Sequence, residues 1–129
     1  MSSSLADGTC VPCKKGAPSL AQEDVESKLQ QLNNASRAFA WDASPLSQSP
    51  SQIALQRTFK FRNFKTALAF TNSVGAIAEE QKHHPLLVLE WGSVHVAWWT
   101  HATGGLHDND FICAAKTSQI ADDAEGIKK

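Results

Sequence analysis

The chain has 129 residues, of which 42% are hydrophobic and 19% charged, and this composition excludes a fibrous repeat and a wholly disordered chain. Twelve basic and thirteen acidic residues give a formal net charge of -1, so no strong field attracts nucleic acid or an anionic membrane. No apolar run approaches the roughly 18 residues that span a bilayer, and the N-terminus lacks the apolar core of a signal peptide. We therefore expect one globular domain in the cytoplasm, with no nucleic-acid or membrane partner.

Residues 1–18 mix serine, glycine, lysine and proline and predict a flexible leader before a domain at 19–122 and a frayed tail at 123–129. Cys10 and Cys13 in the leader have C-x-x-C spacing, but neither a second pair nor a strand-to-helix context supports a redox or zinc motif. With Cys113 the cysteines number three, so at least one thiol stays unpaired. We interpret the C-x-x-C as part of the leader.

The first half of the domain predicts a helix, a short apolar piece and a long strand. A capping box at Ser19-Leu-Ala-Gln22 and an apolar stripe indicate a helix at about 20–34. Phe39-Ala-Trp41 is a short apolar piece, and the prolines and serines of 44–51 indicate a loop. From Ile53 to Arg62 apolar and polar residues alternate, which is typical of a strand with one buried face.

The second half predicts a helix, a hairpin and a last helix. Asn63 can cap the helix, whose apolar stripe contains Phe64, Ala67, Leu68, Thr71, Val74 and Ala78. Pro85 ends it, so His83 and His84 are expected in its last turn. Residues 86–91 and 94–100 form a hairpin around Gly92-Ser93, and 108–120 form the last helix. This order predicts a two-layer α+β fold, with an antiparallel sheet of about four strands and helices packed on one face.

Histidines and carboxylates gather at the ends of these elements. Glu79 and His83 are four residues apart on one helix, so the carboxylate can accept a hydrogen bond from the imidazole and raise its basicity. His84 points elsewhere unless the break at the helix end turns it back toward the same cavity. His101 follows the last strand, Asp110 lies in the first turn of the last helix, and the two can converge on one pocket. Such a cluster predicts an acid–base site.

The same histidines and carboxylates also fit other roles. Each residue alone is more typical of a surface or structural role, and an aspartate in a first helical turn usually serves the helix dipole. Three histidines and a water can bind catalytic zinc, but helical metal pairs favour two histidines at i and i+4, and here that partner is a glutamate. We predict no metal. His95 is interpreted as structural, and His107, in a capping position that favours Ser or Thr, as exposed and outside the site.

A combination of motifs resembles the signature of the pterin-4a-carbinolamine dehydratase family: Glu79-Glu-Gln-Lys-His83-His84-Pro85, an aromatic hairpin, Thr100-His101 and Gly105-Leu106-x-x-x-Asp110. The resemblance spans about residues 20–120 and includes Phe39-Ala-Trp41 and Phe59-x-Phe61-x-x-Phe64. The sequence departs from the family at His107, where Thr or Ser is usual, at Lys82, where an acid is common, and at Cys113-Ala-Ala, where Leu-Ala is usual.

The resemblance implies a hydro-lyase that dehydrates 4a-hydroxytetrahydrobiopterin to quinonoid dihydropterin, recycling the pterin without a metal or other cofactor. It implies a homodimer or homotetramer and a functional link to an aromatic amino acid hydroxylase. The alternative is a protein-binding coactivator or assembly factor of the same fold, alone or alongside the enzyme. The implied site residues are catalytic His83, His84 and His101, with supporting Glu79 and Asp110.

The reaction itself suggests roles for these residues. The 4a-hydroxyl must be protonated as it leaves and a ring nitrogen deprotonated, so we assign His83 and His101 as the acid and base in either order. Glu79 is expected to orient His83, and Asp110 to support His101 or its loop. His84 is expected to bind the pterin, and Trp41 to form either an apolar wall of the site or part of the core.

Overall fold

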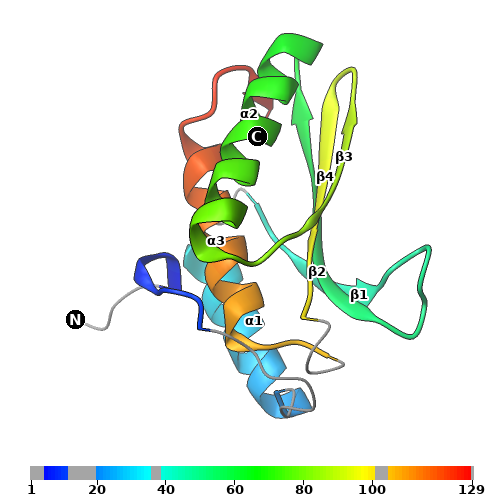
Figure 1. The fold of residues 1–129 in the computed structure, drawn as a ribbon, viewed down its shortest axis with the longest axis vertical. Helices are drawn as coiled ribbons and strands as arrows, with labels where there is room; N and C mark the ends of the chain where they lie inside the picture. The colour runs from blue at the N-terminus through cyan, green and yellow to red at the C-terminus, as the bar shows by residue number, and fades with distance from the viewer. Residues whose placement is uncertain (1–4, 12–19, 36–38, 101–104, 129) are drawn as a thin grey trace.

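The computed structural model describes residues 5–11, 20–35, 39–100 and 105–128. Within these ranges three α-helices cover one face of an antiparallel sheet, as Figure 1 shows. This confirms the two-layer α+β fold predicted from the sequence. The elements are the 3-10 helix η1 (Leu5–Asp7), α1 (Gln22–Ala35), β1 (Asp42–Pro45), β2 (Ile53–Phe61), α2 (Phe64–Gln81), β3 (Leu86–Glu90), β4 (Ser93–Trp98), α3 (Asp108–Asp122) and β5 (Ile127–Lys128).

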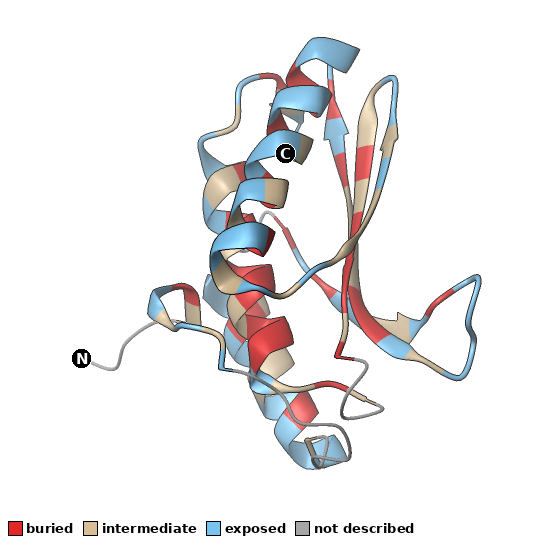
Figure 2. Cartoon of the chain, in the orientation of Figure 1, coloured by how far each residue is buried: buried red, intermediate tan, exposed pale blue. Residues whose placement is uncertain are grey.

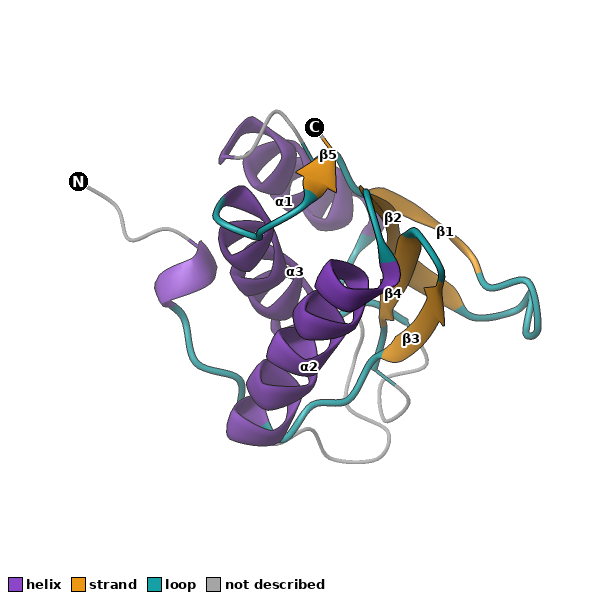
Figure 3. Ribbon diagram, turned by 90° about the horizontal axis from the view of Figure 1, so that it is seen from above, coloured by secondary structure: helices purple, strands orange, loops and turns teal. Residues whose placement is uncertain are grey.

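The sheet has the strand order β1-β2-β4-β3, and every pair is antiparallel. Alternation along β2 places Leu55, Phe59 and Phe61 against the helices, where they are fully buried, as predicted. The view from above in Figure 3 shows the helices together on that side of the strands. Among the described helices none is long and apolar enough to cross a bilayer.

The core lies between the sheet and the helices and is rich in aromatic rings. The Phe59 ring centroid lies 5.3 Å from that of Phe39, 5.7 Å from Trp41 and 4.9 Å from Phe70. Figure 2 shows the buried residues on the facing sides of the two layers. The buried face of α2 contains Ala67, Val74 and Ala78 as predicted, but Phe70 replaces Phe64 and Leu68, which are exposed. Contact with the β2 aromatics therefore sets the rotation of this helix.

Both chain ends depart from the prediction. Residues 5–11, expected in a flexible leader, include η1 and pack against α3, where Lys116 Nζ donates to the Ala6 carbonyl at 2.8 Å. The C-terminal residues expected to be frayed instead form β5, which pairs with β2, and Arg62 N donates to Gly126 O at 3.0 Å. Pairing with the exposed end of β2 satisfies backbone groups that fraying would leave to water.

Two boundaries within the sheet are also corrected. Ser44 and Pro45, predicted in a loop, belong to β1, where Pro45 lies opposite Ile53. Proline is tolerated there because β1 is an edge strand and Pro45 is its last residue. In the hairpin, Glu90 pairs with Ser93, so the two-residue turn is Trp91-Gly92, one position earlier than expected.

Candidate active site

The end of α2 positions the first two histidines. Asn63 caps the start of the helix as predicted, accepting from Thr66 N at 2.9 Å. The helix ends at Gln81, and Lys82 adopts a left-handed conformation with φ 55°. His83 N then donates back to Ala78 O at 3.1 Å, a bond typical of this kind of helix end. His83 and His84 therefore lie just beyond the last turn, and the left-handed residue redirects both.

His83 pairs with Asp110 of α3, not with Glu79 as predicted. His83 Nε2 lies 2.7 Å from Asp110 Oδ1, and because a carboxylate can only accept, Nε2 carries the proton. Asp110 is 0% exposed, and its Oδ2 accepts from Thr100 Oγ1 at 2.9 Å and from His107 N at 3.0 Å. Three donors thus hold the buried charge, which would otherwise be costly to bury.

Trp98 of β4 holds the His83 ring on its flat side. The two rings are stacked, with centroids 5.8 Å apart and an interplanar angle of 9°. Trp98 is itself buried and fixed, because its Nε1 donates to Thr117 Oγ1 of α3 at 3.2 Å. The orientation of His83 is therefore defined by a carboxylate from one helix and a ring from the sheet.

Opposing effects act on the pKa of His83. Burial alone lowers the pKa of the imidazole, since it disfavours the charged form. The hydrogen bond to Asp110 and the negative charges of Asp110 and Cys10 outweigh burial, so the pKa lies above its ordinary value of 6.5. The surroundings of His83 therefore stabilise the protonated imidazolium more than water does around an isolated histidine.

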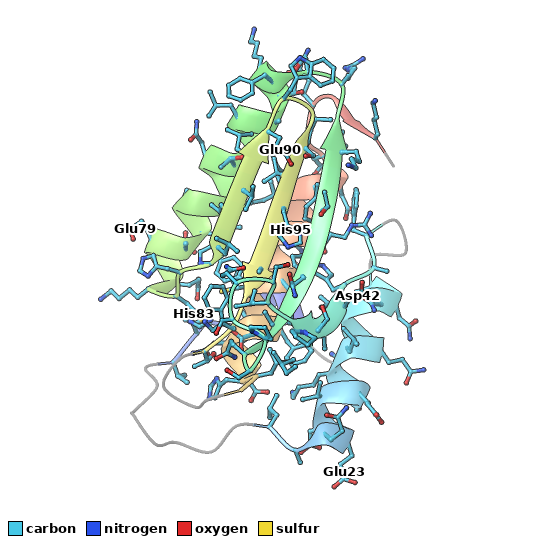
Figure 4. The ribbon with its side chains drawn as sticks, turned by 90° about the vertical axis from the view of Figure 1, so that its right-hand side faces the viewer. Glu23, Asp42, Glu79, His83, Glu90 and His95 are labelled. Carbon is cyan, nitrogen blue, oxygen red and sulfur yellow. The ribbon has the colours of Figure 1, made fainter. Side chains whose placement is uncertain are left out.

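His84 takes the other predicted partner. Its Nε2 lies 2.7 Å from Glu79 Oε2, and the two side chains are 65% and 80% exposed. Figure 4 shows Glu79 on the outer side of α2, away from His83. The two adjacent histidines therefore face different surroundings, one toward the buried carboxylate and one toward solvent.

His107 caps α3, although it was predicted to be exposed. It is partly buried, and its Nδ1 accepts from Asn109 N at 3.1 Å while Asp110 accepts from His107 N. The imidazole nitrogen of His107 thus accepts the backbone hydrogen bond that a serine or threonine oxygen usually accepts at this position. The reciprocal bonds tie Asp110 to the start of α3 as well as to His83.

The remaining predicted residues divide between the core, the outer sheet face and the undescribed part of the chain. Trp41 is 1% exposed and its Nε1 donates to Ser118 Oγ at 2.8 Å, so it belongs to the core rather than to a wall open to a substrate. His95 lies on the sheet face away from the helices (Figure 4), bonded to Thr58 and Gln56, in agreement with a structural role. His101, like Cys13 and Ser19, lies outside the described residues.

Metal ligation and cavities give no further candidate around this pair. Among the described side chains no group of three or more His, Cys, Asp and Glu is arranged to hold a metal ion, and the metal-free site stays a prediction. Two hollows in the described ranges, of about 250 and 360 Å³, lie along α3 beside α1 and α2 respectively, and His83 lines neither.

Thr100 and Trp98 both contact the His83–Asp110 pair, although no role was predicted for either residue. A signal for both existed, because alternation along the strand that contains Val94 and Val96 puts positions 98 and 100 on the same face, toward the helices. Thr100 also pairs with Gly105 in an antiparallel bridge. The hydroxyl that bonds Asp110 therefore comes from the residue that precedes His101 in the chain.

The fold and the site define a class: a small α+β protein in which a histidine just beyond a helix end is held between a buried carboxylate and the sheet. Comparisons with known proteins specify it further. Residues 18–120 match the family described as pterin 4 alpha carbinolamine dehydratase. The chain belongs to this family, whose enzymes dehydrate pterin carbinolamines.

Two similar proteins agree with this assignment. A protein of Saccharophagus degradans named "Putative pterin-4-alpha-carbinolamine dehydratase" is 46% identical over 116 residues, which cover 90% of this chain and 95% of that protein. A crystal structure of a transcriptional coactivator/pterin dehydratase from Brucella melitensis superposes with a TM-score of 0.63 at 27% identity, covering 79% of this chain and 97% of the other.

Proposed function

We propose that the protein dehydrates a 4a-hydroxytetrahydropterin to the quinonoid dihydropterin by histidine acid–base catalysis, with His83 as a proton-transfer residue. The observation that carries this proposal is the His83–Asp110 pair, in which a fully buried carboxylate with three donors fixes the imidazole against Trp98. An oriented histidine whose pKa lies above its ordinary value suits a general acid near neutral pH.

The bonding of His83 suggests which atom transfers the proton. Nε2 is engaged by Asp110, which leaves Nδ1 to protonate the departing 4a-hydroxyl. His101 is proposed as the base that takes the proton from the ring nitrogen, since it follows Thr100, the residue that donates to Asp110. In this scheme Asp110 supports His83 directly, and it also bonds Thr100, the residue that precedes His101 in the chain.

His84 and Glu79 are proposed to bind rather than to transfer protons. Both side chains are largely exposed, and a solvent-facing imidazole–carboxylate pair can hydrogen-bond the polar edge of a pterin that enters beside His83. Trp41 is left out of the proposed substrate contacts because its ring is buried. The elimination needs no metal or additional cofactor in this scheme, because imidazole side chains can donate and accept both protons near neutral pH.

The wider cellular role is also proposed. The dehydration would recycle the pterin used by an aromatic amino acid hydroxylase, in the cytoplasm. Exposed apolar side chains on α2 and along the hairpin are consistent with a homodimer or homotetramer, since such groups are often covered by a partner: Phe64, Leu68, Val88 and Trp91. The Brucella protein is named both a coactivator and a dehydratase, so a protein-binding role alongside the enzyme is the second candidate.

The test is the dehydration rate of freshly generated 4a-hydroxytetrahydropterin, followed by absorbance for the full chain. His83→Ala and His101→Ala are each expected to slow the reaction by about 10²–10⁴-fold, the usual contribution of a positioned acid or base. His95→Gln, a histidine on the other face of the sheet, serves as the matched control and should retain the rate. Treatment with EDTA should change nothing.

Three results would contradict the proposal. Loss of the rate on chelation would indicate a metal, and an unchanged rate in folded His83→Ala would remove His83 from the mechanism. A folded native protein without dehydratase activity would favour the protein-binding role.

A further inference from the structure

The N-terminal segment, which we define as residues 5–11, is fastened to the start of α3 by side chains. Asn109 clamps the backbone of Val11 from both sides, accepting from its N at 3.0 Å and donating to its O at 2.7 Å. Asn109 is almost fully buried, so these bonds are shielded from water. Figure 1 shows η1 and the following residues beside α3. The segment is thus held at the residue that precedes Asp110.

Cys10 of this segment also contacts α2 and a second cysteine. Its N donates to Gln81 Oε1 at 2.8 Å, at the last residue of α2. Its Sγ lies 3.4 Å from Cys113 Sγ of α3 and 3.7 Å from the Asn109 carbonyl, to which the thiol can donate. Both cysteines are reduced, and their sulfur atoms are in van der Waals contact.

The Cys10–Cys113 pair lies beside the two segments that carry His83 and Asp110. Gln81 is two residues before His83, and Asn109 is next to Asp110, so Cys10 bonds both segments that supply the His83–Asp110 pair. A covalent bond here would tie the N-terminal segment to α3 directly beside the candidate active site. The dehydration chemistry assigns no role to either sulfur atom.

We propose that Cys10 and Cys113 form a redox-reversible disulfide that locks the N-terminal segment onto α3 beside the His83–Asp110 pair. A disulfide S–S bond is about 2.05 Å long, so the two sulfur atoms need to approach by roughly 1.4 Å. Rotation of the two side chains and a small movement of the segment can supply this. This inference goes beyond the dehydratase proposal and stands without it.

The surroundings of the two thiols indicate which one reacts first with an external oxidant. The hydrogen bond from Cys113 lowers the pKa of Cys10 against the opposing effect of burial, and the charge on His83 lowers it further. For Cys113 the hydrogen bond with Cys10 and complete burial both raise the pKa. Cys10 is therefore the thiol that an external oxidant reaches, and Cys113 is reached only from within the protein.

With a low-molecular-weight disulfide such as oxidised glutathione as the oxidant, the exchange balances in two steps. The Cys10 thiolate attacks one sulfur atom and forms a mixed disulfide, releasing the first glutathione thiolate. Cys113 then attacks the Cys10 sulfur, releases the second glutathione thiolate and passes its proton to it. Two protein thiols are oxidised to one disulfide, and oxidised glutathione is reduced to two glutathione thiols.

Oxidation of Cys10 and Cys113 should change the pKa of His83. The negative charge on Cys10 contributes to the raised pKa of His83, and a disulfide carries no charge. The pKa of His83 should therefore decrease when the bond forms and return when it is reduced. Asp110 remains in contact with His83 in both states, so its contribution persists.

The experiment equilibrates the folded full-length chain in glutathione buffers of increasing oxidising strength and maps disulfides by mass spectrometry of unreduced peptides. We expect a Cys10–Cys113 crosslink that dithiothreitol reverses. Cys10→Ser should abolish it and Cys13→Ser, the matched control with the neighbouring cysteine changed, should retain it. The crosslink should also decrease the unfolding equilibrium constant roughly 30-fold to 1,000-fold, as is typical of a long closed loop.

Other outcomes would overturn the proposal. A Cys10–Cys13 bond, stable glutathione attachment at Cys10 without a crosslink, or resistance of both cysteines to oxidation would each do so. If Cys10→Ser fails to fold, Cys113→Ala gives the same test, since it leaves Cys10 able to form only the mixed disulfide or the Cys13 bond. NMR titration of the His83 ring in the oxidised and reduced protein then reports the coupling, and an unchanged pKa would refute it.

Discussion

His83 and His84 are adjacent in the chain, and each places Nε2 2.7 Å from a carboxylate oxygen, yet the two pairs have different surroundings. The His83–Asp110 pair is 12% and 0% exposed, and two further donors hold the carboxylate. The His84–Glu79 pair is 65% and 80% exposed. Equal distances therefore do not imply equal strength, because water screens the outer pair and solvates each partner when the pair opens.

The largest effect is expected from Asp110→Asn, which keeps the size of the side chain but removes the buried charge. The variant should lose about 3 kcal/mol or more of unfolding free energy, since His83, Thr100 and His107 all lose a charged acceptor. Urea unfolding measures this change. The dehydration rate should also decrease, and a variant as stable and active as the native protein would show that the inner pair is no stronger than the outer one.

A smaller loss should follow from Thr100→Val, which deletes one buried donor to Asp110. We expect a cost of about 1–2 kcal/mol in unfolding free energy and a decrease in kcat. Thr58→Val is the matched control, because it removes a hydroxyl bonded to His95 on the other face of the sheet. A decrease in kcat of the same size in both variants would indicate a general loss of stability rather than an effect on the inner pair.

The pH dependence of stability separates the histidines by the direction of their pKa shifts. His83 faces Asp110 and Cys10, and its folded pKa lies above 6.5. Its contribution to stability is therefore complete below about pH 6.5 and is lost as the pH increases through the folded pKa. His95 behaves oppositely, because burial lowers its pKa, so its contribution is lost as the pH falls below about 6.5.

Urea unfolding between pH 5 and 9, on the native chain and on His83→Gln and His95→Gln, checks both signs. Each variant should remove one limb of the dependence. The same limb missing from both variants would contradict the assignment.

The smallest effect is expected from Glu79→Gln, which breaks the outer pair. The free energy of unfolding should change by less than about 1 kcal/mol, because both partners are well solvated. If His84 binds the pterin, KM should increase while kcat is nearly unchanged. A loss of stability comparable to that of Asp110→Asn would remove the distinction between the pairs.

Local patterns predicted most of the elements correctly. The alternation of β2, the Asn63 cap and the hairpin depend on neighbouring residues, and the structure confirms each in outline. The bounds were less accurate, because the last residue of α2 and the position of the hairpin turn depend on single backbone conformations such as that of Lys82. The cap at His107 was missed because imidazole rarely takes this role.

The sequence by itself determined the fold class, because the order of helices and strands follows from short-range periodicity. It also determined the resemblance to the dehydratase family, because that resemblance depends on the spacing of short motifs. Only the tertiary structure decided that Asp110, and not Glu79, bonds His83. That contact joins residues 27 positions apart and depends on the left-handed turn after α2 and the docking of α3. The contact of Cys10 with Cys113, 103 positions apart, likewise depends on packing, which no local pattern encodes.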